Sequence, residues 1–182
     1  MERKVSFFFY LALIWIVSIF GFLIPDLRYF LALEPRESSG LIGILTMHLV
    51  HQDWEHLLSN TLSFTVFSWM ILVKNSRYYH RSVISSAILT GILLWILGRD
   101  AAHIGASGVI FALFGLIMTN AYITRGLVDV IGALIVFFLY GSLLFGVLPT
   151  EPSISWEAHL LGVLSGMAIA SLLQKFRHLE NK

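Results

Sequence analysis

The chain has 182 residues, of which 57% are hydrophobic and 13% charged, and its mean hydropathy is +0.81. An ordinary soluble domain has about 25% charged residues, so this composition excludes a soluble globular protein. The 12 Lys and Arg nearly balance the 11 Asp and Glu, and a net charge of +1 excludes a large basic surface for nucleic acid. Cysteine is absent, which excludes disulfides, thiolate zinc sites and cysteine nucleophiles.

Six stretches contain no Asp, Glu, Lys or Arg and are apolar enough to be helices in lipid. A bilayer core needs roughly 17 to 25 helical residues, and the two shortest stretches are flanked by residues that can reach the headgroups. We therefore predict an all-α membrane protein, a six-helix bundle that forms a single domain over residues 1–182. The predicted spans are 5–24, 57–73, 82–97, 104–124, 130–148 and 158–173.

The first stretch follows Arg3 and Lys4, a pattern that also suits a secretory signal peptide. It ends without a small-residue cleavage site, so we expect this span to be retained. The next connection, residues 25–56, contains amphipathic runs at 27–31 and 41–45 that favour the outer membrane interface. The connection at 149–156 carries two prolines and is predicted to be non-helical.

The charges between the spans predict the orientation of the chain. With a cytoplasmic N-terminus, nine Lys and Arg residues lie inside and three lie outside, which satisfies the positive-inside rule. Both termini are then cytoplasmic, and the second, fourth and sixth spans run inward from the outer surface. The nine are Arg3, Lys4, Lys74, Arg77, Arg81, Arg125, Lys175, Arg177 and Lys182; the three are Arg28, Arg36 and Arg99.

Polar side chains gather at the beginnings of these three inward-running spans. The second span opens with His56 and Asn60, which share a helical face, the fourth opens with Ser107, and the sixth opens with His159. Polar groups in lipid are costly and are candidates for function. Because the three spans begin at similar depth, we expect these side chains to meet near the outer surface.

Each of these signals also has a structural interpretation. The small residues around Ser107 suit helix packing, His159 suits an interfacial histidine, and His56 and Asn60 suit hydrogen bonds between helices. The functional interpretation is favoured by a stripe of small residues on the sixth span and a matching face of small residues on the fourth. Close packing of these two faces would bring the serine hydroxyl within hydrogen-bond reach of the imidazole. The stripe is Ala158, Gly162, Gly166 and Ala170; the matching face is Gly108, Ala112 and Gly115.

This arrangement predicts an activated serine. His159 would take the Ser107 proton while the oxygen attacks an amide carbonyl. The Ser107 backbone N–H, the Asn60 amide and the His56 imidazole are the available oxyanion donors. No carboxylate lies inside a span, so the sequence favours a Ser-His dyad, with assistance from Glu157 or Asp100 left open.

Three sequence blocks together resemble the rhomboid intramembrane serine proteases. They are His51-x4-His56-x3-Asn60, Gly105-x-Ser107-Gly108 and His159-x2-Gly162-x3-Gly166. The resemblance implies a rhomboid-like fold and cleavage of a substrate's transmembrane segment near its outer end. It also implies an interfacial hairpin in the first outer loop and a mobile cap in the loop before the sixth span.

By position, the resemblance makes Ser107 the nucleophile, His159 the general base, and His56, Asn60 and the Ser107 amide the oxyanion hole. It gives a structural role near the site to six further residues, His51, Gly105, Gly108, Phe111, Gly162 and Gly166. Phe111 stands where the family often has a tyrosine that stacks on the histidine. The implied partners are membrane-protein substrates and the lipid bilayer, without a cofactor or a metal.

Two other functions remain open. One is a catalytically inactive rhomboid-like protein that binds transmembrane helices, although such a binder has no need of both Ser107 and His159. The other is a small transporter or channel, which the lack of internal repeats and mid-membrane charges disfavours. The expected location is a prokaryotic cell membrane, since no transit-peptide pattern is present.

Overall fold

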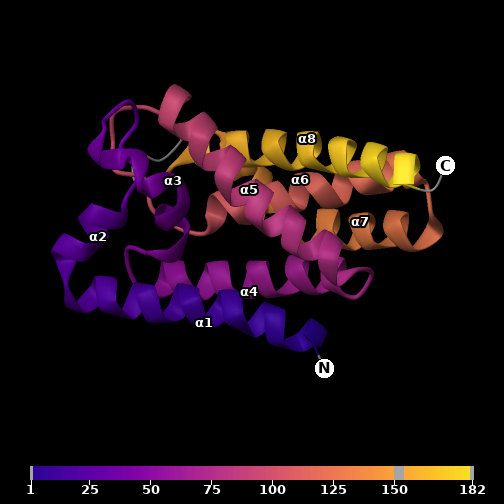
Figure 1. Ribbon diagram of the computed structural model, residues 1–182, viewed down its shortest axis with the longest axis horizontal. Coiled ribbons are helices and arrows are strands. Elements are labelled where there is room, and N and C mark those ends of the chain that lie inside the picture. The colour runs from indigo at the N-terminus through magenta and orange to yellow at the C-terminus, as the bar shows by residue number, and fades with distance from the viewer. Residues whose placement is uncertain (1, 150–153, 181–182) are drawn as a thin grey trace.

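The computed structural model describes residues 2–149 and 154–180, and their long elements are all helices (Figure 1). Residues 150–153 of the predicted cap loop and Lys182 lie outside the described residues, as do the side chains of Arg3, Lys4 and Arg177. The long helices are α1 (Glu2–Leu23), α4 (Trp54–Leu72), α5 (Ser76–Leu97), α6 (Ser107–Thr124), α7 (Leu127–Tyr140) and α8 (Trp156–Glu180). The short ones are α2 (Pro25–Leu31), α3 (Gly43–Thr46) and the 3-10 helices η1 (Ser39–Leu41), η2 (Met47–Leu49) and η3 (Gly141–Val147).

The long helices lie roughly along the longest axis of the molecule, except α5, which crosses the others obliquely (Figure 1). Helices α1, α5 and α7 run one way, and α4, α6 and α8 run the other way. The long connections, at 24–53, 98–106 and the described part of 141–155, lie at one end, which we call the loop end. The short connections at 73–75 and 125–126 lie at the opposite end, which we call the turn end.

Each predicted span has a helix at its position, although some boundaries differ. Helix α5 begins at Ser76 instead of 82, because the Asn75 side chain accepts a hydrogen bond from the Tyr78 backbone N–H (2.8 Å) and caps the helix. Helix α7 ends at Tyr140, and η3 occupies most of the remaining predicted span. By length and apolar composition, three described segments qualify as membrane spans, and the count of six stays a prediction. They are Ser76–Leu97, Ser107–Thr124 and Trp156–Lys175.

Helix α6 lies at the centre of the bundle and contacts α4, α5, α7 and α8. It is buried without interruption over residues 108–117, as expected of a helix that is apolar on all sides. Its closest neighbour is α8, where a Cβ atom on Gly162 or Gly166 would overlap the carbonyl groups of Gly108 or Ala112. The small-residue stripe therefore lets the two backbones touch, as the sequence predicted.

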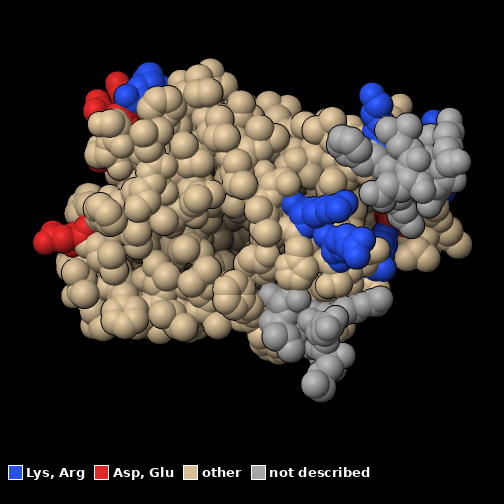
Figure 2. Space-filling model, viewed as in Figure 1, with Lys and Arg blue, Asp and Glu red and all other residues tan. Residues whose placement is uncertain are grey.

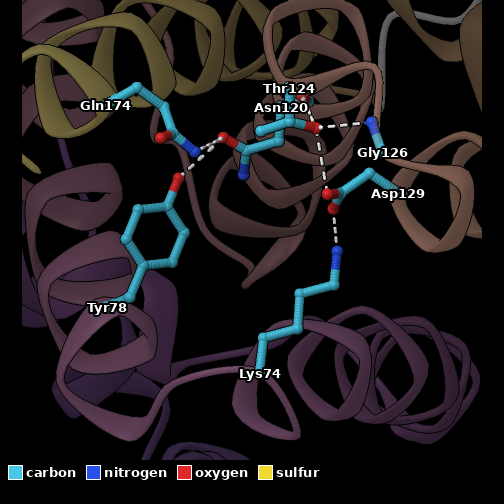
Figure 3. Close-up of polar contacts among 7 residues, drawn as sticks. All are labelled: Lys74, Tyr78, Asn120, Thr124, Gly126, Asp129 and Gln174. Atoms are coloured by element: carbon cyan, nitrogen blue, oxygen red, sulfur yellow. Dashed lines mark hydrogen bonds and ion pairs between the residues drawn. The ribbon is translucent and has the colours of Figure 1, made fainter. Parts of the chain in front are cut away.

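Six polar side chains from four helices and one connecting turn meet at the turn end (Figure 3). They are Lys74, Tyr78, Asn120, Thr124, Asp129 and Gln174. Lys74 forms an ion pair with Asp129, whose Oδ2 lies 2.9 Å from the Thr124 hydroxyl. The Asn120 side-chain oxygen accepts hydrogen bonds from the tyrosine and the glutamine. Figure 2 shows that most of the Lys and Arg side chains of one face lie toward this end, while a smaller group lies beside acidic side chains at the loop end.

Candidate active site

Ser107 is the first residue of α6, at the loop end, and hydrogen bonds hold the backbone that precedes it. The Gly105 N–H donates to the Met47 carbonyl (2.8 Å), and the Ala106 N–H donates to His51 Nε2 (3.2 Å). Gly105 has φ +116°, a conformation that residues with a side chain rarely adopt. The two residues before Ser107 are therefore each held by a hydrogen bond from their backbone N–H.

The Ser107 hydroxyl and the His159 imidazole are hydrogen-bonded. Ser107 Oγ lies 2.9 Å from His159 Nε2, and His159 Nδ1 lies 2.8 Å from the carbonyl oxygen of Gly146. A carbonyl oxygen can only accept, so Nδ1 carries the proton and Nε2 turns its lone pair to the serine. This tautomer is the one in which the imidazole can take a proton from the hydroxyl.

The His159 ring is also held from its face. The Phe111 ring stacks on it, with centroids 4.1 Å apart and planes inclined by 9°. Gly146 lies so close that a Cβ atom there would be 3.0 Å from His159 Nδ1 and 3.3 Å from Phe111 Cζ. The stack on Phe111 and the bond to the Gly146 carbonyl together fix the orientation of the imidazole.

His56 lies beside the same turn, on the first helical turn of α4. A Cβ atom on Gly105 would be 2.7 Å from His56 Cε1 and 3.7 Å from Ser107 Oγ, so both side chains flank this glycine. One turn further along α4, the buried Asn60 amide donates to the His56 carbonyl (2.9 Å) and retains a second hydrogen. In the described part of the chain, neither His56 nor Asn60 is hydrogen-bonded to Ser107.

His51 connects this turn to α1 through a chain of hydrogen bonds. Its Nε2 accepts from the Ala106 N–H, so its Nδ1 donates to Ser18 Oγ (2.9 Å), and the Ser18 hydroxyl donates to the Leu49 carbonyl (2.9 Å). Burial, reinforced by nearby His56 and His48, lowers the pKa of His51 to about 3. The ring is therefore neutral near pH 7, as this chain of bonds requires.

The two carboxylates that the sequence left open have other partners. Asp100 forms an ion pair with Arg36, and Glu157 lies 3.6 Å from Arg99. Glu157 precedes His159 by two residues, which places the two side chains about 200° apart around α8. The proton on His159 Nδ1 is instead accepted by a backbone carbonyl.

Two residues near the site carried no prediction from the sequence. His103 Nδ1 lies 2.6 Å from Ser155 Oγ, and both belong to connecting segments at the loop end. His103 precedes Ser107 by four residues and Ser155 precedes His159 by four, so the spacing offered a weak signal. In the part of the chain whose side chains are described, no three His, Asp or Glu side chains are grouped to hold a metal ion.

Comparison with known proteins identifies the family. The Rhomboid domain family matches residues 38–176. An uncharacterized protein of Mycobacterium tuberculosis is 30% identical over 174 residues, which cover 90% of this chain and 72% of that protein. A protein of Acanthamoeba polyphaga mimivirus, named "Putative rhomboid protein", is 27% identical over 171 residues, which cover 90% of this chain and 88% of that protein. The family expected from the three sequence blocks is thus confirmed, and the chain belongs to the rhomboid family.

Proposed function

We propose that the protein is an intramembrane serine endopeptidase that hydrolyses a peptide bond in or next to the transmembrane segment of a membrane protein. The observation that carries the proposal is the 2.9 Å hydrogen bond between Ser107 Oγ and His159 Nε2, in the tautomer that can accept the serine proton. Membership of the rhomboid family supports it, since that family consists generally of such proteases.

The reaction follows from the two side chains. His159 Nε2 takes the hydroxyl proton while Ser107 Oγ bonds to the substrate carbonyl carbon, which forms a tetrahedral oxyanion. The imidazolium donates that proton to the leaving amine as the C–N bond breaks, and an acyl ester remains on Ser107. Water then attacks the ester, with its proton passing to His159, and the serine regains a proton as the acid product leaves.

Three groups are the proposed donors to the oxyanion. The Ser107 backbone N–H is unpaired within the helix because it belongs to the first turn of α6. Asn60 retains an amide hydrogen beyond its bond to the His56 carbonyl, and the His56 ring flanks Gly105. Removing one such donor from a serine protease costs about 3 kcal/mol of transition-state stabilisation.

We also propose that the single domain crosses the membrane six times, with both termini in the cytoplasm. The charges support this orientation, since most of the described Lys and Arg residues lie toward the turn end, and only Arg28, Arg36 and Arg99 among them belong to the loop end (Figure 2). The loop end would then face the outside, and Ser107 would lie at a depth that water can reach. This places cleavage near the outer end of a substrate helix, in a prokaryotic cell membrane.

The test is cleavage of a fluorescent transmembrane peptide by purified protein in detergent micelles and in liposomes. We expect the wild type to cut the peptide and Ser107→Ala to lose at least about a thousandfold in kcat/KM. Ser171→Ala, which removes an exposed hydroxyl from α8, is the matched control and should cleave like the wild type.

The opposite result would change the proposed function. If folded wild-type protein cuts none of several peptides, or if Ser107→Ala cuts as fast as the wild type, the protein is not a serine protease of this kind. Capture of intact transmembrane peptides without cleavage would then favour the inactive rhomboid-like protein that binds transmembrane helices.

A further inference from the structure

The two connecting segments that lead into the reacting pair are joined to each other. His103 lies in the connection between α5 and α6, and Ser155 immediately precedes α8. Their side chains are 2.6 Å apart, from His103 Nδ1 to Ser155 Oγ. His103 is four positions before Ser107, and Ser155 is four positions before His159. The bond therefore links the segments that lead into the N-termini of α6 and α8, the helices that carry Ser107 and His159.

The direction of this hydrogen bond follows from the second ring nitrogen. His103 Nε2 lies 3.2 Å from the Arg99 carbonyl, which can only accept, so Nε2 carries the proton and Nδ1 accepts from the Ser155 hydroxyl. Burial lowers the pKa of His103, which keeps the Nδ1 lone pair available near pH 7. The single hydroxyl hydrogen of Ser155 is therefore donated to His103.

His103 is itself rigidly held. Its side chain is 2% exposed, and its backbone N–H and carbonyl pair with the carbonyl and N–H of Leu33 at 2.8 and 3.0 Å. The ring and the backbone thus join three segments of the loop end, at 24–53, 98–106 and 154–155. Because His103 is held in place, its bond to Ser155 can hold the N-terminus of α8 in place as well.

A second contact runs parallel to the first. Arg99 donates to the Ile154 carbonyl (2.9 Å) and forms an ion pair with Glu157 at 3.6 Å. Glu157 is only 6% exposed, and no hydrogen bond to its Oε2 is formed in the described part of the chain. The carboxylate therefore acts as a charge that holds the first turn of α8 toward Arg99, on the side of the helix away from His159.

The consequence concerns the distance between the reacting atoms. The α6–α8 contacts at Gly162 and Gly166 hold the two helices together, and Gly108 faces Ala158 across their first turns, so the connecting segments add a further constraint at the residues just before the pair. A misplacement of about 1 Å in an active site can cost a hundredfold in rate. The bond between His103 and Ser155, just before the N-termini of α6 and α8, can therefore keep Ser107 Oγ and His159 Nε2 within hydrogen-bond reach.

We propose that His103 is a positioning residue. Through its bond to Ser155 it holds His159 at hydrogen-bond distance from Ser107, and the contacts of Arg99 with Ile154 and Glu157 hold the same helix end. This role rests on the proposed protease function. It predicts that loss of the bond lowers kcat and leaves KM nearly unchanged, because the substrate is still bound while the reacting pair is misaligned.

The test compares Ser155→Ala with Ser155→Thr. The alanine variant removes only the hydroxyl and should lower kcat about tenfold with KM within twofold, whereas the threonine variant keeps a hydroxyl donor and should recover most of kcat. His103→Leu should lower kcat to the same extent as Ser155→Ala, and the double variant should lose no more than either single one. Thr46→Val, which removes another loop-end hydroxyl bond, to the Leu31 carbonyl, is the control for general stability and should leave kcat unchanged.

The outcomes separate the two proposals. An active wild type labelled at Ser107, together with Ser155→Ala at wild-type kcat, would overturn the positioning role and leave the protease function standing. A loss of kcat in Ser155→Ala that Thr46→Val matches at equal thermal stability would also overturn it. A folded wild type without cleavage or labelling would overturn the protease function and the positioning role with it.

Discussion

The loop end and the turn end both join several helices through polar side chains, but they do so with different chemistry. At the turn end, charges of opposite sign meet where side chains are partly exposed, as in the pair of Lys74 with Asp129. The loop end also has ion pairs, of Arg36 with Asp100 and Arg99 with Glu157, but in the described part of the chain it alone adds buried neutral imidazoles held by carbonyl and hydroxyl groups, as in His51 and His159. An exposed ion pair is satisfied and inert, whereas an imidazole with one nitrogen bonded presents a defined lone pair at the other.

The largest expected difference between the ends is the pH dependence of stability. Burial lowers the pKa of His48 to about 4 and of His51 to about 3, from 6.5 in the unfolded chain. Between pH 6.5 and the lowered pKa values, the unfolded chain binds more protons than the folded chain. The free energy of unfolding is therefore highest above pH 6.5 and decreases as the pH falls below it. We expect a loss of about 2 kcal/mol for each histidine between pH 8 and pH 5, measured by thermal unfolding in detergent.

His48→Gln separates this effect from the protonation of carboxylates. Glutamine can keep the hydrogen bond that His48 Nε2 donates to the Ala87 carbonyl (3.0 Å) but does not titrate. The loss of stability between pH 8 and pH 5 should therefore shrink by about 2 kcal/mol. An unchanged pH dependence in this variant would mean that His48 is not buried as a neutral ring.

The next largest effect concerns the proposed oxyanion donors at the loop end. Asn60→Ala should lower kcat about a hundredfold, because it removes an amide hydrogen that can stabilise the oxyanion. Ser59→Ala is its matched control, since Ser59 and Asn60 both donate to the His56 carbonyl and Ser59 is exposed. Equal effects of the two variants on kcat would show that the carbonyl contact matters and the oxyanion donor does not.

A smaller effect is expected from Gly146→Ala. The added methyl group would lie 3.0 Å from His159 Nδ1, so the ring must shift by a few tenths of an ångström, and kcat should fall about tenfold. In the same 3-10 helix, a Cβ atom on Gly141 meets nothing within 4 Å, so Gly141→Ala should cleave like the wild type. Comparison of kcat for the two variants tests whether the position of the His159 ring beside Gly146 matters for the reaction.

The smallest effect should come from the turn end. Asp129→Asn and Lys74→Gln break an ion pair whose side chains are 22% and 44% exposed, so each should change the free energy of unfolding by less than about 1 kcal/mol. Cleavage kinetics should stay within twofold of the wild type. A tenfold loss of kcat in either variant would contradict the division between an inert turn end and a reactive loop end.

Much of the helical arrangement was predictable because charges avoid lipid. Stretches without charged residues located the long helices, but not where each one ends. Helix α5 continues through Arg77 and Arg81 to its cap at Asn75, because a helix can extend beyond the apolar core into the membrane interface. The early change of α7 to a 3-10 helix has no comparable signal in residue composition.

The candidate site was predictable to the extent that its chemistry is carried by side chains. Small residues on two helices predicted the close approach of Ser107 and His159, and the hydrogen bond between them is observed. The acceptor for His159 Nδ1 is the Gly146 backbone carbonyl, and a backbone acceptor has no residue-type signature. The bond between His103 and Ser155 depends on two connecting segments meeting in space, which periodicity along one helix cannot predict.

The most direct measurement is the site and rate of covalent labelling by a fluorophosphonate, determined by peptide mass spectrometry. In the wild type we predict a single adduct on Ser107, formed at least about a hundredfold faster than in His159→Ala, because the imidazole must take the serine proton. An adduct on another residue, or labelling of Ser107 at the same rate without His159, would contradict the assignment of these two side chains as a nucleophile and its base.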